Sequence, residues 1–295
     1  MERGSYNLPP LSAFKIRWSI LILLILVHIG AVAAFWFFTW PAFFTFLGLY
    51  VLTGMLGITV GYHRLLAHRS FETYRWVRAI HVLLGVLAMQ LGPLTWARLH
   101  RAHHARSDGK DDPHPQIYGF WYGHMAWAFL SHPDIGKAGM WKESASDLRA
   151  DPLLKILEKY YIPILAASLI ALFAIGGWPF LLWAGAFRIV WVLHITWCVN
   201  SVCHRFGYRN FDTKDFSVNS WPIGLLAWGE GWHNNHHRYP NSARQGLRWF
   251  EIDASWLWIR MLKLVGLAWS IKTPALLAEE SEPEIPNAIS QPPVR

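Results

Sequence analysis

Four long apolar stretches limit what this 295-residue chain can fold into. A helix needs about 20 mainly apolar residues to cross a membrane. Residues 18–38 and 41–61 meet this requirement and are joined by a tight connection, while residues 161–175 and 178–199 form a second pair joined at a Gly-Gly turn. We therefore expect an all-α integral membrane protein built on two transmembrane hairpins, with four spans in total.

The composition agrees with a membrane protein. Hydrophobic residues make up 53% of the chain and charged residues only 16%, whereas about a quarter of a soluble domain is charged. The 19 Trp residues suit the interface between lipid and water. The formal net charge of +8 indicates basic residues retained in the cytoplasm, or a basic face for acidic headgroups or an acidic redox partner. No nucleic-acid partner is expected.

Basic residues flank both hairpins at the ends away from their turns. Because Lys and Arg are retained on the cytoplasmic side, both hairpins are expected to start and finish in the cytoplasm, in a bacterial plasma membrane. The flanking residues are Arg3, Lys15, Arg17, Arg64, Arg69, Lys155, Lys159, Arg205 and Arg209.

The remaining segments are expected to form a helical cytoplasmic cap within one domain, residues 1–277. Residues 76–94 are also apolar, but a crossing there would separate two histidine clusters. We therefore expect a helix lying in the membrane interface. Residues 278–295, which are rich in Pro and Glu, are expected to be a disordered tail.

Three histidine clusters lie beside these stretches, on the side predicted to be cytoplasmic. Histidine is the commonest metal ligand among side chains, and one ion could not bind so many. The expected topology allows all nine to converge on a multinuclear site. They are His63-x4-His68, His100-x2-His103-His104, His233-x2-His236-His237 and the single His204.

The spacing within the clusters predicts how they face a metal. Residues i, i+3 and i+4 share a helix face, so each H-x-x-H-H cluster should present three imidazoles as a compact fan. His63 and His68 would diverge by about 140° on a regular helix, which suits ligands to different metals or a helix that unwinds. Imidazole binds Zn, Cu, Fe and Ni, but eight or nine histidines suit two metals of four or five ligands each.

Longer strings around the clusters resemble the membrane fatty-acid desaturases, and among them the acyl-CoA Δ9 (stearoyl-CoA-type) branch. The similarity spans roughly residues 15–250. The strings are Gly57-Ile58-Thr59 before His63-Arg64, Trp96-Ala97-Arg98, His100-Arg101-Ala102-His103-His104, Asp112-Pro113-His114, Asn200-Ser201-Val202-Cys203-His204 and Gly229-Glu230-Gly231-Trp232-His233-Asn234-Asn235-His236-His237.

The resemblance implies a two-iron enzyme that uses O2 as co-substrate. It would insert a cis double bond, at Δ9, into a saturated acyl chain carried on CoA or on a lipid and held in a buried tunnel. No catalytic residue beyond the metal centre is implied. Carried over position by position, the ligands are His63, His68, His100, His103, His104, His204, His233, His236 and His237, with Asn200 acting through a water.

Other residues are expected to support this site. A ligating histidine usually donates its second N–H to a carboxylate or carbonyl, which makes Asp112, Glu230 and Asn234 candidates for orienting imidazoles. Arg188 lies inside the fourth apolar stretch. An intramembrane charge is a functional candidate, and we expect it to line the acyl tunnel or to pair with interfacial segments.

One position departs from the resemblance. Animal acyl-CoA desaturases carry an acidic residue just before the first histidine of the second cluster, in a region associated with the CoA headgroup. This chain has Leu99 there, although Arg98, a candidate substrate contact, remains. An acyl-lipid or acyl-carrier-protein substrate is therefore an alternative to CoA.

The chain shows no Rossmann glycine fingerprint and no cytochrome b5-like region, so we expect a separate electron donor of the ferredoxin or cytochrome b5 type. A hydroxylase, or a desaturase of different regiochemistry, could use the same scaffold. A histidine-rich metal transporter is an alternative of another class, but it would need ligands near the bilayer midplane.

Overall fold

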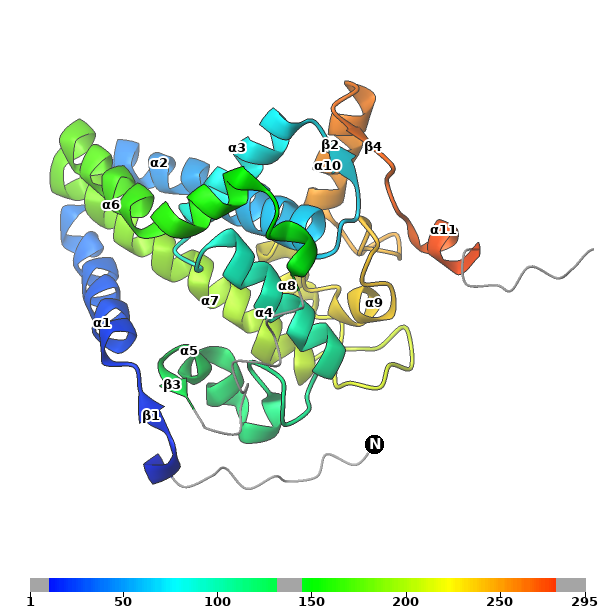
Figure 1. Ribbon diagram of the computed structural model, residues 1–295. Coiled ribbons are helices and arrows are strands. Elements are labelled where there is room, and N and C mark those ends of the chain that lie inside the picture. Colours follow the sequence, from blue (N-terminus) through cyan, green and yellow to red (C-terminus); the bar gives the residue numbers. More distant parts are fainter. Residues whose placement is uncertain (1–10, 132–144, 280–295) are drawn as a thin grey trace, which may run out of the picture.

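The computed structural model describes residues 11–131 and 145–279, and helices dominate it (Figure 1). The apolar helices α1 (Trp18–Ala33), α2 (Trp40–Tyr50) and α6 (Pro152–Phe180) lie at the left in Figure 1, and α9 (His233–Arg238) lies at the right. Between them lie α7 (Arg188–Ser201) and α4 (Pro93–Arg106); α4 and α9 carry six of the nine histidines.

Three helical stretches in the described chain are long and apolar enough to cross a membrane: Trp18–Phe37, Trp40–Ala67 and Pro152–His204. Many apolar side chains of the first stretch face outward, including Leu26 and Ile29, each 60% exposed. Such a surface suits lipid rather than water. A helical membrane protein is therefore confirmed, while the predicted four spans require the third stretch to cross twice.

The first hairpin turns where the sequence predicts. Helix α1 continues as a 3-10 turn, η2 (Ala34–Phe37), and the chain becomes extended at Thr39. The Thr39 hydroxyl accepts a hydrogen bond from the Ala42 N–H at 3.4 Å, and Pro41 occupies the first helical turn, where its missing N–H costs nothing. The second helix then runs beyond the predicted end at residue 61, through η3 (Val51–Ala67).

The second hairpin also turns at the predicted glycines, but its first helix is longer than expected. Gly177 has a φ of +63°, which glycine adopts at little cost, and this breaks the helix before it continues through η7 (Leu181–Phe187) into α7. Helix α6 begins at Pro152 rather than at residue 161. The reason is local: the Asp151 carboxylate accepts hydrogen bonds from the first N–H groups, 2.9 Å to Leu153.

Helix α3 (Arg75–Val86) packs tightly on η3 through glycine. A Cβ atom at Gly57 would lie 2.5 Å from the backbone nitrogen of Gly85, closer than such atoms approach. The two backbones can therefore meet only because this position carries no side chain.

The expected interfacial helix over residues 76–94 is wrong in its extent. Helix α3 ends at Val86, and the next residues include Met89 and Leu91 with φ of +58° and +74°. These left-handed conformations stop the helix, and Pro93 then starts α4 in a new direction. The exposed side chains of Trp76 and Ile80 favour the predicted interfacial placement, which stays a prediction.

Short elements complete the cap. Two antiparallel ribbons join distant segments: β1 (Lys15–Ile16) pairs with β3 (Leu130–Ser131), and β2 (Glu72–Thr73) pairs with β4 (Ala268–Trp269).

The predicted tail lies outside the described residues from position 280 onward. The other elements are η1 (Leu11–Ala13), η4 (Gln116–Tyr118), η5 (Tyr122–Ala126), α5 (Trp127–Phe129), η6 (Ser146–Leu148), η8 (Val202–His204), α8 (Trp221–Leu226), α10 (Ala254–Leu264) and α11 (Pro274–Glu279).

Candidate metal centre

The structure brings all nine predicted histidines together in two adjacent groups. Within each group the ligand nitrogens lie within 4.8 Å of one another, the arrangement needed to hold one metal ion. We call them the five-histidine position and the four-histidine position. The first consists of His63, His68, His100, His104 and His236, and the second of His103, His204, His233 and His237.

Of the two alternatives for the first cluster, the structure contradicts ligands to different metals and agrees with a helix that departs from regular α-helical winding. His63 and His68 do not diverge toward different metals, because η3 is wound as a π-helix and the His68 N–H donates to the His63 carbonyl at 3.0 Å. In i→i+5 winding the wider turn brings residue i+5 over residue i. The Nε2 atoms of His63 and His68 consequently lie 3.1 Å from that of His236 and 2.7 Å from that of His100, within one group.

The H-x-x-H-H clusters do not act as compact fans either. In α4, the Nε2 atoms of His100 and His104 lie 3.0 Å apart in the five-histidine position, while His103 faces the four-histidine position. Successive residues of an α-helix are rotated by about 100°, so adjacent histidines point to different positions. The third cluster divides in the opposite sense: His233 and His237 join the four-histidine position and His236 the other.

Several imidazoles are oriented from behind by a carboxylate. Nδ1 of His103 lies 2.9 Å from Asp112, and Nδ1 of His63 contacts Glu230. These are two of the three orienting contacts expected from the sequence. With Nδ1–H held by a carboxylate, Nε2 carries the free lone pair that can bind a metal.

The third candidate, Asn234, does something else. Its Oδ1 accepts hydrogen bonds from the N–H groups of Asn210 and Phe211, both at 2.8 Å, and its Nδ2 donates to the Phe211 carbonyl and to Thr213. The amide therefore holds the loop that follows α7, and within the described residues no contact with an imidazole is found.

Two further carboxylates orient imidazoles and were missed from the sequence. Asp108 lies 2.9 Å from Nδ1 of His204, and Asp215 lies 2.7 Å from Nδ1 of His237. Both belong to irregular loops, and Asp108 has a left-handed φ of +60°. Neither stands at a helical spacing from its histidine, so no local pattern pointed to them.

The electrostatics of these carboxylates differ. Burial by itself raises the pKa of Asp108, but the charge and hydrogen bond of His204 outweigh it and lower the pKa to about 2. For Asp215, burial is likewise outweighed by His237, and the pKa falls far below its usual range. For Asp112 burial dominates and raises the pKa to about 6, so all three are mainly ionised at neutral pH.

Burial also sets the protonation state of the imidazoles. It lowers the pKa of six of them well below the ordinary value of 6.5, which keeps them neutral at physiological pH. A neutral imidazole is the form that binds a metal. The six are His68, His100, His103, His104, His233 and His236.

The residues fit a pair of resident metal ions on a second ground. Nε2 of His103 is buried and has no hydrogen-bond partner in the described chain, although its Nδ1 is held by Asp112. A buried polar atom without a partner is costly, and an ion at the four-histidine position would supply one. The all-imidazole ligand set suits iron, but also zinc and copper.

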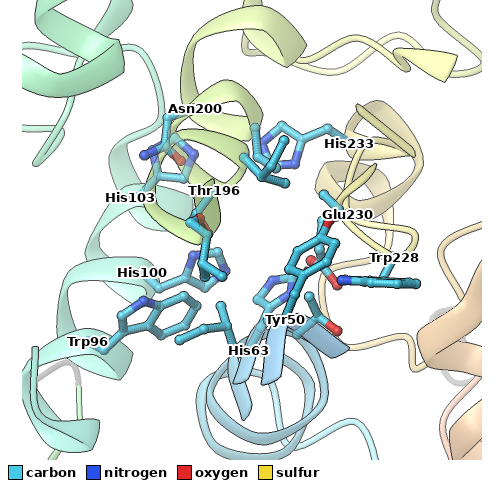
Figure 2. Close-up of a pocket in the computed structure, with 17 residues that line it drawn as sticks. Tyr50, His63, Trp96, His100, His103, Thr196, Asn200, Trp228, Glu230 and His233 are labelled. Atoms are coloured by element: carbon cyan, nitrogen blue, oxygen red, sulfur yellow. Dashed lines mark hydrogen bonds and ion pairs between the residues drawn. The ribbon is translucent and has the colours of Figure 1, made fainter. Parts of the chain in front are cut away.

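A cavity opens beside the two positions. Figure 2 shows His63 of η3, His100 and His103 of α4, and His233 of α9 around it. The Asn200 side chain also lines this cavity, from α7. Its predicted metal contact through a water stays a prediction.

The two arginines proposed as substrate contacts lie elsewhere. Arg188 is 2% exposed and donates to the carbonyls of Ala184 (2.7 Å) and Leu87 (2.8 Å) and to the Thr53 hydroxyl (3.0 Å). It therefore ties α7 and η3 to the end of α3, and its predicted pairing with interfacial segments stays a prediction. Within the described chain neither Arg188 nor Arg98 lines the cavity.

Comparison with known proteins agrees with this geometry. Residues 34–261 match the model of the fatty acid desaturase family. An sn-1 stearoyl-lipid 9-desaturase of Anabaena variabilis is 44% identical, over 88% of this chain and 94% of that protein. A protein of the same description from Synechocystis is 43% identical (87% and 80%), and a chloroplastic palmitoyl-monogalactosyldiacylglycerol delta-7 desaturase of Arabidopsis thaliana is 41% identical (84% and 67%).

These matches do not single out the acyl-CoA branch that the motifs resembled, since lipid desaturases are among them. They leave no ground for a metal transporter. The match covers most of the chain and includes every histidine of both positions. The chain therefore belongs to the membrane fatty acid desaturase family.

Proposed function

We propose that this protein is an oxygen-dependent di-iron desaturase that places a cis double bond at Δ9 of a saturated acyl chain esterified in a membrane lipid. One observation carries the proposal: the cavity that could hold an acyl chain is walled by imidazoles of both metal positions. His63 and His100 come from the five-histidine position, and His103 and His233 from the four-histidine position.

The nine histidines would hold two irons, and Asn200 would approach one of them through a water. Bound iron supplies the O2 activation and hydrogen abstraction that no side chain can provide for an unactivated methylene. The chain's own contribution is to place one pair of acyl carbons beside the histidines and to hold it there.

Two polar groups of the cavity lining are occupied by Gln90. Its Nε2 donates to the Thr196 hydroxyl at 2.8 Å, and its Oε1 lies 3.4 Å from Trp96 Nε1. The Trp96 ring stacks on His100, with ring centroids 5.0 Å apart. The surfaces offered beside the metal centre are therefore largely apolar, which favours a hydrocarbon and disfavours water.

Aromatic rings form part of the cavity lining. Tyr50 and Trp228 line it, with ring centroids 5.0 Å apart, and the Tyr50 hydroxyl donates to the Leu226 carbonyl. Tyr50 precedes His63 by about three helical turns. We propose that the distance from these rings to the histidines determines which acyl carbons face the metal centre.

Two observations favour a lipid as the carrier of the acyl chain. Leu99 offers no charge where the acyl-CoA branch has an acidic residue, and similar proteins from two cyanobacteria are lipid 9-desaturases. A relative of different regiochemistry, the delta-7 desaturase, makes double-bond position the first property to test.

The proposal includes the predicted topology. The stretch Pro152–His204 would cross twice, because it is broken at Gly177, and this gives four spans. The metal centre would face the cytoplasm of a bacterial plasma membrane. A separate ferredoxin or cytochrome b5-type donor would supply the electrons.

The test is expression in a host that has no oxygen-dependent desaturase, together with a ferredoxin and its reductase. Wild type is compared with His236→Ala, and the double bonds of intact lipids are mapped by mass spectrometry. New Δ9 monoenes in lipid-bound chains, lost in the variant, are expected. A hydroxylated product or unsaturation at another carbon would contradict the proposed outcome, and labelling of acyl-CoA before lipid would contradict the proposed carrier.

A further inference from the structure

Carboxylates are distributed unevenly between the two metal positions. In the four-histidine position, three of four imidazoles have Nδ1 hydrogen-bonded to an aspartate at 2.7–2.9 Å: His103 to Asp112, His204 to Asp108 and His237 to Asp215. In the five-histidine position, the described chain gives one such contact, that of His63 with Glu230.

That one carboxylate is shared with a cation. Arg64 is fully buried, and its Nη2 lies 3.1 Å from Glu230 and 2.9 Å from Asp253. The positive guanidinium therefore partly neutralises the Glu230 carboxylate that contacts His63. Behind His236, the nearest group is the neutral amide of Gln245, 3.3 Å from Nδ1.

The three aspartates of the other position are held as anions by neutral donors. Asp215 accepts hydrogen bonds from the Ser217 N–H (3.0 Å) and the Thr213 hydroxyl (2.9 Å). Asp108 accepts one from the Phe216 N–H (2.8 Å), and Asp112 accepts one from the His114 N–H (3.0 Å). Such donors fix each carboxylate without cancelling its charge.

A carboxylate behind an imidazole makes that imidazole a more basic ligand. A negative charge near a metal, such as a carboxylate that accepts a hydrogen bond from a ligating imidazole, stabilises the more oxidised state of the metal and so lowers its reduction potential. The four-histidine position has three such carboxylate–imidazole pairs among its four ligands. The five-histidine position has one pair among its five ligands, and its carboxylate is shared with Arg64.

We propose that the two irons are unequal: Asp108, Asp112 and Asp215 are positioning residues that give the four-histidine position the lower reduction potential. On reduction, the iron at the five-histidine position would accept the first electron. The inference rests on the proposed di-iron function, and it assigns a role to two aspartates outside the recognised histidine motifs.

The test uses full-length protein purified in detergent and loaded with ⁵⁷Fe. Mössbauer spectra recorded during a reductive titration count the irons and follow each one separately. In wild type, one iron should be reduced before the other. Asp215→Asn keeps the shape of the side chain but removes its charge. It should therefore raise the reduction potential of the iron that is reduced second and leave the potential of the iron that is reduced first unchanged.

A matched control lies in the same loop. Asp212 is fully exposed and contacts no imidazole in the described structure, so Asp212→Asn makes the same charge change without touching the site. The control should reproduce the wild-type titration. Asp215→Asn should also weaken retention of one of the two irons by about 10–100-fold in competition with a chelator, and Asp215→Glu should restore part of it.

Asp108→Asn provides an independent variant should Asp215→Asn fail to fold. If both irons are reduced together in wild type, or if folded Asp215→Asn or Asp108→Asn titrates like Asp212→Asn, the inference is overturned. A wild-type protein that binds no iron, or binds a single ion, would overturn the di-iron function itself, which separates the two failures.

Discussion

The protein contains a second group of hydrogen-bonded histidines, and it differs from the metal centre in the partners of the two ring nitrogens. Here Nε2 of His28 lies 3.0 Å from Nε2 of His194, and Nδ1 of His194 lies 3.0 Å from Nε2 of His124. The line ends at Leu24, whose carbonyl is 2.6 Å from His28, and at the Ser201 hydroxyl, 2.9 Å from His124. We call it the histidine chain.

In the histidine chain both nitrogens of each imidazole are used on neutral neighbours, one after another. In the metal centre the Nε2 atoms converge, and carboxylates or an amide occupy several of the Nδ1 atoms behind them. The comparison teaches that many close histidines are not enough for a metal site. Convergence of one nitrogen per ring, with the other ring nitrogen anchored, is the distinguishing feature.

The largest expected effect separates the two groups directly. His236→Ala removes a ligand from the five-histidine position, so product formation should fall below detection and iron content should drop from two per chain to one or none. His194→Ala should keep two irons, because it breaks only the histidine chain. Iron analysis and lipid analysis of both purified variants check this. Iron loss from His194→Ala would break the comparison.

The next effect concerns the buried charges beside the metal centre. Arg64→Met leaves Glu230 and Asp253 buried without their cation, and removing one partner of a buried pair costs about 3–5 kcal/mol. The free energy of unfolding of the metal-free protein, from denaturant titration in detergent, should fall by that amount. A change below about 1 kcal/mol would show that the guanidinium does not compensate these carboxylates.

A third effect is acid sensitivity of the metal-free protein. Burial lowers the pKa of His100, His104 and His236 in the folded state, whereas in the unfolded chain each titrates near 6.5. Below pH 6.5 the unfolded state therefore binds more protons, and stability falls as pH falls. The loss approaches about 1.4 kcal/mol per pH unit for each such imidazole, and melting curves from pH 8 to pH 5 measure it. Bound iron should oppose unfolding and shift the loss to lower pH.

The smallest effect belongs to the histidine chain. His124→Asn removes the contacts with Ser201 and His194 but leaves a side chain that can still form a hydrogen bond. A neutral hydrogen bond contributes about 0.5–1.5 kcal/mol, so the melting temperature should fall slightly while iron content and product stay at wild-type levels. Loss of activity with two irons retained would show that the histidine chain has a functional role that does not depend on binding metal, unlike the metal centre.

Much of this molecule could be predicted from sequence because the relevant signals are local or periodic. The apolar stretches predicted both hairpin turns, and the histidine spacings predicted which residues converge. His204 carries no spacing pattern of its own, so the predicted topology placed it beside the clusters and the resemblance to a known family gave it a ligand role.

The errors have physical causes that a periodicity of 3.6 residues does not capture. The π-helical winding of η3 reverses the expected divergence of His63 and His68. The 100° rotation between adjacent residues divides each H-x-x-H-H cluster between two ions. Asp108 and Asp215 reach their imidazoles through loop conformation alone, and left-handed residues after Val86 shorten α3.

The division of the clusters has a mechanical consequence. Helices α4 and α9 each give ligands to both positions, and the remaining ligands come from the ends of two apolar stretches. With both ions bound, α4 and α9 would each be held at two points, while the end of each apolar stretch would be held at one, so neither α4 nor α9 could rotate about a single ion. Binding of the two irons and rigid attachment of the cap to the membrane helices would then occur together. If either ion were lost, α4 and α9 could rotate about the ion that remains.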